Sequence, residues 1–365
     1  MKNIQRRTTS IVRPLVILLA LLPAIVLAGC SIPDRPDEAA TSIELVDDAG
    51  RTVELSGPLT KVVVANRYNV ELIRAMGSID TVASVDTNTA QDRAYWPQFD
   101  PDEVIGKGQS DLNLEKIIEL APQALILPRN GSVDEYAAKL EPAGIKVVTV
   151  TGWDNAELPK QMDILGRALG NEDGAQKVTD MFTSVSQQIT DAVGDQPRKS
   201  VYWEYGDPFT TAVPGTSNDG WHQMVVLAGG TNIFADADPA GAAVDPEAVL
   251  AANPDLIVKT TSGGALKNTG VYTPPAAGDF DAIGAEMTSR PGWTGLDAVR
   301  NGNVHFLTGF AGGGLGKVVG SAYVAKWLYP EHTADLDPDQ VFADWMKLQD
   351  MAPVDGHVHT LPAMR

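Results

Sequence analysis

Residues 113–127 read NLEKIIELAPQALIL and residues 245–259 read DPEAVLAANPDLIVK, so one fifteen-residue pattern occurs twice, 132 positions apart. Each copy starts at an N-cap residue, Asn113 or Asp245, and continues as a short amphipathic helix that stops before a proline. An apolar strand follows in each copy. The duplication therefore predicts an α/β fold with two similar lobes.

Each copy also carries a glutamate two residues after its cap, Glu115 and Glu247. In a βαβ unit the helix N-terminus lies at the edge where the strands end, which is the edge where open α/β sheets bind ligands. An acid in a first helical turn is favoured by the helix dipole by about 0.3–1 kcal/mol, so a purely structural role explains either residue alone. Equivalent exposed acids on two lobes favour a two-point docking surface instead.

The N-terminal residues have the pattern of an export signal. The apolar run at residues 15–27 is short for a membrane span and is interrupted by Pro23. It closes on Leu27-Ala28-Gly29-Cys30, which resembles a bacterial lipobox with Cys30 as the lipidated residue. Four basic residues precede the run: Lys2, Arg6, Arg7 and Arg13. We therefore expect a lipoprotein signal peptide at residues 1–29, a lipid-anchored linker at residues 30–42, and an extracytoplasmic protein on the outer face of the cytoplasmic membrane or in the periplasm.

Charge and cysteine content exclude several classes of function. Cys30 is the only cysteine, so the chain forms no intrachain disulfide and no thiolate metal cluster. The formal charge of −19 becomes −23 once the four basic residues of the signal are removed. Such an acidic balance argues against nucleic acid as a partner.

The remaining sequence predicts two lobes and one connection between them. An alternating hairpin at residues 43–55 opens an N-terminal α/β lobe at residues 43–156. Two helical patterns without any strand signal occupy residues 157–195, which we interpret as a single helical connection. A C-terminal α/β lobe is expected at residues 196–350, followed by a poorly ordered tail at residues 351–365.

Six segments of the chain carry a family resemblance when they are taken together. They are Asp48-Ala-Gly-Arg51, Asn113-Leu-Glu-Lys-Ile117, Leu165-Gly-Arg-Ala-Leu-Gly170, Ala228-Gly-Gly-Thr-Asn-Ile233, Asp245-Pro-Glu-Ala-Val249 and Ala322-Tyr-Val-Ala-Lys-Trp-Leu-Tyr-Pro330. Jointly they resemble the iron-siderophore and cobalamin group of ABC-importer substrate-binding proteins. The likeness covers roughly residues 43 to 348, and it departs from many relatives at residues 309–316, where they place an arginine or a bulky residue.

This resemblance implies two Rossmann-like α/β lobes joined by one long helix, with a ligand cleft between the lobes. It further implies an extracytoplasmic substrate-binding component that captures an iron chelate such as a ferric siderophore. The chelate would be delivered to an ABC permease powered by a separate ATPase, with Glu115 and Glu247 docking into arginine pockets of the permease. In such a protein the chain itself performs no chemistry and holds no cofactor.

Ligand candidates are the side chains that follow the expected strand ends, where loops of both lobes converge. Arg67 and Arg129 each follow an apolar strand and suit an anionic chelate, whereas a corrinoid would rely more on aromatic walls. About half of the aromatic candidates are expected to fill the core instead. The candidates are Asn66, Arg67, Tyr68, Tyr95, Trp96, Arg129, Trp153, Trp203, Glu204, Tyr205, Trp221, His222 and Tyr272.

The residues are also compatible with three other functions. His222 and Tyr272 are possible axial ligands of a haem iron, although no Tyr-x-Arg pattern accompanies them. An extracytoplasmic metalloenzyme would use His222, Glu204 and Asp219, yet no motif with metal-ligand spacing occurs. A haem or siderophore relay without its own permease is the third.

The glycine-rich stretch and the last histidines carry no recognisable motif. Residues 312–316 lack the Gly-Lys-Ser/Thr ending of a P-loop, so we expect a flexible cleft loop there. His357 and His359 lack a third ligand, so no specific metal site is expected.

Overall fold

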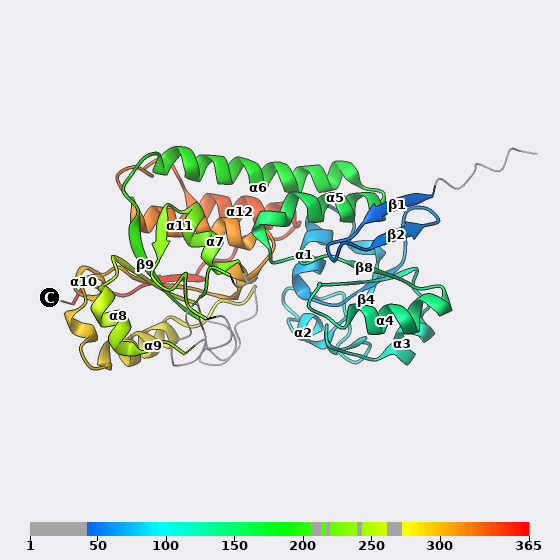
Figure 1. Ribbon diagram of the computed structural model, residues 1–365, viewed down its shortest axis with the longest axis horizontal. Helices are drawn as coiled ribbons and strands as arrows, with labels where there is room; N and C mark the ends of the chain where they lie inside the picture. The colour runs from blue at the N-terminus through cyan, green and yellow to red at the C-terminus, as the bar shows by residue number, and fades with distance from the viewer. Residues whose placement is uncertain (1–41, 206–212, 217–219, 239–242, 261–271, 365) are drawn as a thin grey trace, which may run out of the picture. The chain divides into compact units, whose positions relative to one another are not determined.

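The apolar runs of the sequence form two separate sheets, one in each half of the molecule (Figure 1). The computed structural model describes residues 42–205, 213–216, 220–238, 243–260 and 272–364. These residues belong to one unit spanning residues 41–365. No helix within these ranges combines the length and the apolar character needed to cross a bilayer. The expected signal peptide, Cys30 and most of the linker lie outside the described residues.

The N-terminal lobe is built on four parallel strands in the order β4-β3-β7-β8. Alternate residues of each strand face opposite sides of the sheet. Val62 and Val64 pack with α1 and with α5 (Leu158–Leu169), whereas Val63 and Leu125 pack with α3 and α4. Helices therefore cover both faces, as in a Rossmann-like lobe. The elements are β3 (Val62–Val64), α1 (Arg67–Ala75), β4 (Val82–Val85), α3 (Leu114–Leu120), β7 (Ala124–Leu127), α4 (Val133–Leu140) and β8 (Lys146–Thr149).

Smaller elements complete this lobe. The antiparallel hairpin of β1 (Ile43–Val46) and β2 (Thr52–Leu55) matches the predicted one and packs on α5 and β8. A short helix, α2 (Thr87–Ala90), precedes a small antiparallel pair formed by β5 (Gly106–Gly108) and β6 (Asp111–Leu112).

The C-terminal lobe has a five-stranded sheet in the order β10-β9-β11-β12-β13. Its first four strands are parallel, and helices again cover both faces: α7 and α11 pack on one side, while α8 and α9 pack on the other. The strands are β9 (Lys199–Tyr205), β10 (Gly230–Asn232), β11 (Leu256–Thr260), β12 (Val304–Leu307) and β13 (Val358–Thr360). The helices are α7 (Trp221–Leu227), α8 (Pro246–Ala252), α9 (Ala277–Ser289), α10 (Asp297–Asn301), α11 (Gly316–Leu328) and α12 (Pro338–Leu348).

The expectation of a poorly ordered tail is wrong for residues 351–364. Strand β13 pairs antiparallel with β12 and forms the edge of the C-terminal sheet. His357 is buried just before this strand, and Leu361 is buried just after it. A strand of three residues is too short to leave an alternation signal in the sequence, and only its neighbour β12 stabilises it.

Two consecutive helices occupy the segment where we expected a single helical connection. Helix α5 (Leu158–Leu169) ends at Gly170 in the left-handed conformation, and α6 (Glu172–Val193) follows after the N-cap Asn171. Figure 1 shows α6 running from beside α5 toward β9. Its buried side chains join a core cluster that contains residues of both lobes. The connection is therefore packed along its length.

The repeated pattern has the predicted structure in both lobes. Asn113 caps α3 by accepting the N–H of Lys116, and Asp245 caps α8 by accepting the N–H of Glu247. Both helices end on a left-handed residue, Ala121 or Asn253, directly before a proline. Strands β7 and β11 then continue into the centre of their sheets.

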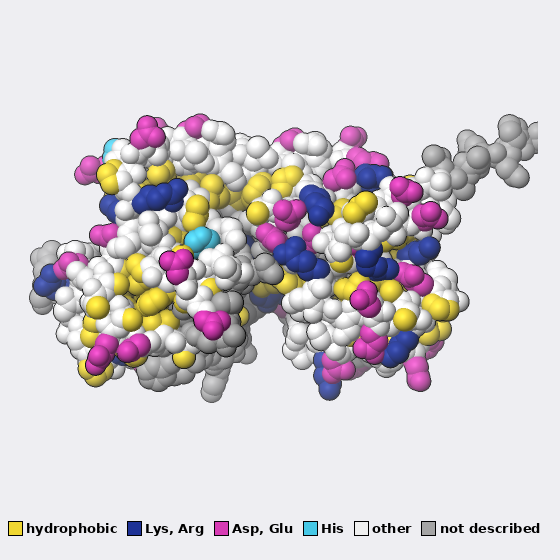
Figure 2. Space-filling view, viewed as in Figure 1, with side chains coloured by type: hydrophobic (Ala, Val, Ile, Leu, Met, Phe, Trp, Pro, Cys, Tyr) yellow, Lys and Arg dark blue, Asp and Glu magenta, His cyan; other side chains and the backbone are white. Residues whose placement is uncertain are grey.

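The surface agrees with the acidic composition. Figure 2 shows acidic side chains spread over both lobes on the face in view, with basic side chains interspersed among them. That face therefore has no continuous basic stripe of the kind that binds nucleic acid.

Candidate functional site

The two lobes meet where the start of α1 and the loop after β8 contact a glycine-rich loop of the C-terminal lobe. We call this contact the lobe junction; it comprises residues 66–68, 150–153 and 309–316. The N–H of Gly314 donates to the carbonyl of Gly152 at 2.6 Å. A Cβ atom at Gly312 or Gly313 would overlap Tyr68, so the loop approaches this ring closely only because it lacks side chains there.

Aromatic side chains from both lobes gather at this junction. In the N-terminal lobe, the rings of Tyr68 and Trp153 meet edge to face with centroids 6.1 Å apart. In the C-terminal lobe, the ring of Trp221 lies 5.8 Å from that of Tyr205. The two ring pairs approach each other at Gly220, which directly precedes Trp221: a Cβ atom added to Gly220 would lie 2.8 Å from the carbonyl oxygen of Trp153. We call Tyr68, Trp153, Tyr205 and Trp221 the aromatic group.

The members of the aromatic group differ in how much surface they offer. Tyr205 is 40 % exposed, and Tyr68 and Trp153 are half-buried. Trp221 is buried, and the ring of Trp203 packs behind it at a tilt of 36°, with centroids 5.2 Å apart. Trp203, a predicted ligand contact, therefore supports Trp221 from within the core.

Arg67 reaches across the junction. Its Nη2 donates to the hydroxyl of Tyr68 at 3.0 Å and to the carbonyl of Gly309 at 3.4 Å. Its guanidinium also lies over the Tyr68 ring, 4.9 Å from the centroid. This side chain is thus partly engaged in holding Tyr68 against the C-terminal lobe.

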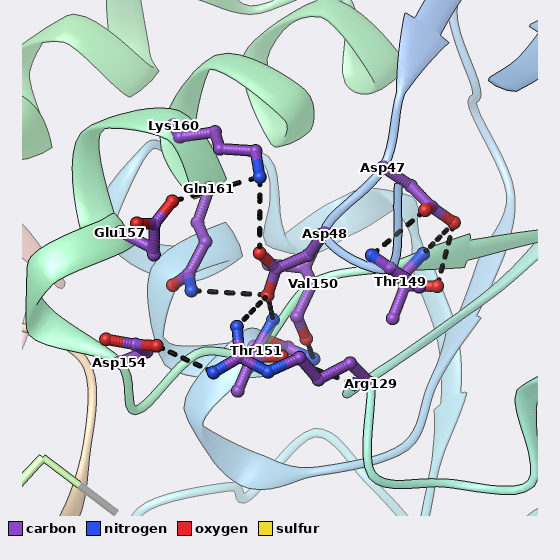
Figure 3. Close-up of polar contacts among 12 residues, drawn as sticks. Asp47, Asp48, Arg129, Thr149, Val150, Thr151, Asp154, Glu157, Lys160 and Gln161 are labelled. Carbon is purple, nitrogen blue, oxygen red and sulfur yellow. Dashed lines mark hydrogen bonds and ion pairs between the residues drawn. The ribbon is translucent and has the colours of Figure 1, made fainter. Parts of the chain in front are cut away.

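Arg129 takes part in an ion-pair network within the N-terminal lobe (Figure 3). Its Nη2 lies 2.7 Å from Oδ2 of Asp154, and its Nη1 lies 3.7 Å from Oδ2 of Asp48. The buried Asp48 also accepts the N–H of Thr151 at 2.9 Å and lies 3.8 Å from Nζ of Lys160. The network ties the loop that carries Trp153 to the β1–β2 hairpin, and the charge of Arg129 is already paired.

Trp96, a predicted ligand contact, and Tyr95 are both fully buried, so neither ring offers surface in this arrangement. The guanidinium of Arg74 lies over both rings, 4.0 Å from the centroid of Tyr95 and 3.9 Å from that of Trp96. Tyr272 of the C-terminal lobe stacks on Tyr95 at 6.0 Å. These residues form a second contact between the lobes.

Two of the three residues considered for a metal site, Glu204 and His222, contact other side chains. Glu204 is buried and pairs with Lys259 at 2.8 Å and with Arg290 at 2.7 Å. Nδ1 of His222 lies 3.3 Å from the side-chain amide of Asn232. Asp219 lies outside the described residues. Among the residues whose structure is described, no group of three potential metal ligands occurs.

Glu115 and Glu247 occupy equivalent exposed positions. Each lies in the first turn of its helix, α3 or α8, two residues after the N-cap. Both carboxylates are thus available on the surface of their respective lobes.

Sequence reasoning missed two charged residues near the junction. Lys317 is fully buried at the start of α11, with its Nζ 4.6 Å from the centroid of the Trp221 ring. Glu71 is buried on α1, and loss of hydration raises its pKa to about 8. The available signals were a lysine directly after the glycine-rich stretch, and an acid inside an apolar helical pattern with arginines four residues before and three residues after it.

Comparison with known proteins places the chain among solute receptors. The family model described as "Periplasmic binding protein" matches residues 62–309. The vitamin B12-binding protein of Salmonella typhimurium is 25% identical over 207 residues, which cover 56% of this chain and 74% of that protein. The vitamin B12-binding protein of Vibrio cholerae serotype O1 is 26% identical over 251 residues, which cover 66% of this chain and 87% of that protein.

Solved structures share the fold. The TroA-like periplasmic binding protein FepB from Veillonella parvula superposes with a TM-score of 0.68 at 23% identity, covering 88% of this chain and 100% of that one. The molybdate periplasmic binding protein MolA from Haemophilus influenzae gives 0.67 at 16% identity, covering 85% and 98%. A periplasmic heme-binding protein from Pseudomonas aeruginosa gives 0.56 at 23% identity, covering 75% and 94%. The two-lobed α/β fold predicted from the sequence is thereby confirmed.

Proposed function

Since the chain belongs to the periplasmic binding protein family, we propose that it is the extracytoplasmic substrate-binding component of an ABC importer. It captures a metal chelate between its lobes and hands it to a permease that a separate ATPase drives. In this role the chain binds the chelate, positions it on the permease and releases it, and it catalyses no reaction.

The aromatic group is the observation that decides which class of ligand we favour. Tyr68, Trp153 and Tyr205 offer ring surface from both lobes, which suits a large ligand with an extended apolar face. The two arginines expected to bind an anionic chelate are engaged elsewhere, Arg129 with Asp154 and Arg67 with Tyr68 and Gly309. These contacts favour a corrinoid over a strongly anionic chelate, and the names of the curated relatives point the same way.

A ferric siderophore is the second candidate. Arg67 and Lys317 place two positive charges near the aromatic group, and movement of the lobes on binding would free Arg67 from its contact with Gly309. An anionic chelate would then meet a guanidinium beside the Tyr68 ring.

The remaining parts of the proposal concern attachment and docking. Cys30 anchors the chain to the membrane through its lipid, and the linker that follows lets the lobes reach the permease. Glu115 and Glu247 dock on the permease, one from each lobe. We assign docking to these two glutamates because they occupy equivalent exposed positions at the starts of α3 and α8.

Titration calorimetry on the purified full chain in detergent tests the ligand class. We expect cyanocobalamin to bind at submicromolar concentration, and Trp153→Ala to weaken it about tenfold, the equivalent of about 1.4 kcal/mol lost with one aromatic contact. The control is Trp327→Phe, since Trp327 stacks on His305 within the C-terminal lobe and is not part of the junction. Binding of a ferric hydroxamate or catecholate that depends on Arg67 would establish the second candidate. Absence of binding to cyanocobalamin, both siderophore classes and haemin would contradict a metal-chelate receptor.

A further inference from the structure

Glu71 lies in the second turn of α1, beneath the lobe junction. It is 2 % exposed. Its Oε2 lies 3.5 Å from the position that a Cβ atom on Gly314 would occupy, and the backbone of Gly314 is itself bonded to Gly152. The glycine-rich loop of the C-terminal lobe therefore covers this carboxyl group. Separation of the lobes would return it to water.

Neither carboxyl oxygen of Glu71 has a hydrogen-bond partner among the described residues. Two arginines on the same helix lie at positions suited to pairing with it, four residues before and three residues after. Arg67 instead donates to Tyr68 and Gly309. Arg74 donates to the carbonyl of Tyr95 at 2.7 Å and to the side-chain oxygen of Gln349 at 2.9 Å. The two nearest cations are thus committed to other acceptors.

The charged and titratable groups around Glu71 come from two elements. Helix α1 contributes Arg67 and Arg74, which favour the ionised carboxylate, and the turn after α2 contributes Asp92, which disfavours it. Tyr95 from the same turn is uncharged, because burial raises the pKa of its phenol well above the usual value. The loop of the C-terminal lobe presents the backbone of Gly314 to this carboxyl. Loss of hydration is the largest effect and raises the pKa of Glu71 to about 8.

We propose that Glu71 holds a proton while the lobes are in contact and releases it to water when they separate, so that acid strengthens the lobe junction. Closing takes up one proton on the carboxylate, and opening returns it to the solvent. The proposal concerns the junction alone and does not depend on the identity of the ligand.

The direction of the pH effect follows from the two pKa values of one group. With the lobes in contact, the pKa of Glu71 is about 8; with the lobes apart, water would reach the carboxyl and its pKa would fall toward the ordinary glutamate value of about 4.3. The closed form therefore binds the proton more tightly than the open form. The proton favours the closed form fully at pH values below the open-state pKa. As the pH rises from the open-state pKa to the closed-state pKa, the closed-to-open ratio falls by at most about tenfold per pH unit.

Distance measurements between spin labels on the two lobes test the proposal. The full chain carries Cys30→Ser, Asp134→Cys on α4 and Ala285→Cys on α9, both exposed positions. Electron–electron double resonance from pH 5 to pH 9 should show the short-distance population falling relative to the long one by at least tenfold. Glu71→Gln keeps a neutral group of the same shape, so its ratio of short-distance to long-distance populations should not change over this pH range. The control Glu54→Gln, at an exposed acid on β2 of the same lobe, should follow the parent.

A second measurement reports the proton itself. Carboxyl carbon resonances of glutamate-labelled protein should include one with a midpoint above pH 6, and this resonance should be missing in Glu71→Gln. A distance distribution that does not change with pH overturns the proposal, and so does an equal pH response in Glu71→Gln. A Glu71 midpoint at the ordinary value also overturns it.

Discussion

The side-chain oxygen of Gln349 accepts the Nη2 of Arg74 at 2.9 Å and the hydroxyl of Tyr95 at 2.6 Å. Gln349 follows α12, and α12 packs on α11, whereas Arg74 and Tyr95 belong to the N-terminal lobe. One buried amide oxygen thus joins two lobes that are distant in sequence. A charged donor and a phenol both depend on it.

Gln349→Ala should lower the free energy of unfolding by about 2–3 kcal/mol, because a buried guanidinium and a buried hydroxyl lose their acceptor. Urea unfolding followed by circular dichroism measures this loss. Gln340→Ala is the matched control: Gln340 is an exposed glutamine on α12 whose side-chain amide donates to Asp344 at the surface, and loss of this side chain should cost less than about 0.5 kcal/mol. Equal losses in both variants would show that the contact between the lobes adds nothing to stability.

Two buried histidines at the edge of the C-terminal sheet should make the protein sensitive to acid. Burial lowers the pKa of His305 to about 3 and that of His357 to about 4. Each binds a proton more readily when unfolded, so the stability that each contributes is present above about pH 6.5 and declines as the pH falls toward the folded value. The expected loss is about 1.4 kcal/mol per pH unit for each histidine within this window.

His357→Gln should therefore flatten the fall in unfolding free energy between pH 6.5 and pH 5 relative to the parent. Gln keeps a polar group within reach of the Thr308 hydroxyl, which now contacts Nδ1 of His357 at 2.7 Å. His332→Gln provides the control, since His332 is exposed. Acid sensitivity that is unchanged in His357→Gln would assign it to other groups.

The repeat in the sequence predicted most of the fold, because its signals are local. Caps, prolines and apolar runs act within one helix or strand, and the two copies at residues 113–127 and 245–259 fold as α3 with β7 and as α8 with β11. Strand β13 was not predicted because it is held in place by pairing with β12, a strand more than fifty residues away in the sequence. Local pattern carries no information about such a neighbour.

The sequence could predict which loops converge and could not predict the contact of each side chain. Loops at one edge of a sheet converge, and the structure brings Tyr68 to Trp153 and Tyr205 to Trp221. The partner of each charged side chain could not be predicted. Arg129 pairs with Asp48, which the β1–β2 hairpin brings to the edge of β8 from far away in the sequence.

Reversal of charge at both proposed docking glutamates should separate transport from binding. In Glu115→Lys combined with Glu247→Lys, uptake of the ligand into cells should fall at least a hundredfold, because each lobe loses an ion pair with the permease. The dissociation constant measured by calorimetry should stay within twofold of the parent. Glu172→Lys serves as the control, because Glu172 is an exposed first-turn acid on α6. A weakened affinity in the double variant would instead place these glutamates in the ligand site.

Gly313→Ala should force the lobes apart at their junction. The backbone of Gly313 is extended, with φ at −170°, so alanine introduces no backbone strain there. Its Cβ would instead overlap the ring of Tyr68, and the N–H of Gly314 would lose its contact with the carbonyl of Gly152. Hydrogen exchange at Gly314 should accelerate at least tenfold.

The companion variant Gly313→Ala with Tyr68→Ala removes the overlapping ring and should restore slow exchange at Gly314, because the added methyl group then has space. Gly278→Ala is the matched control, since a Cβ at Gly278 meets no atom within 4 Å. Slow exchange in Gly313→Ala alone would mean that the loop accommodates the methyl group without moving, and that the lobe junction is held by contacts other than the close approach of the loop to Tyr68.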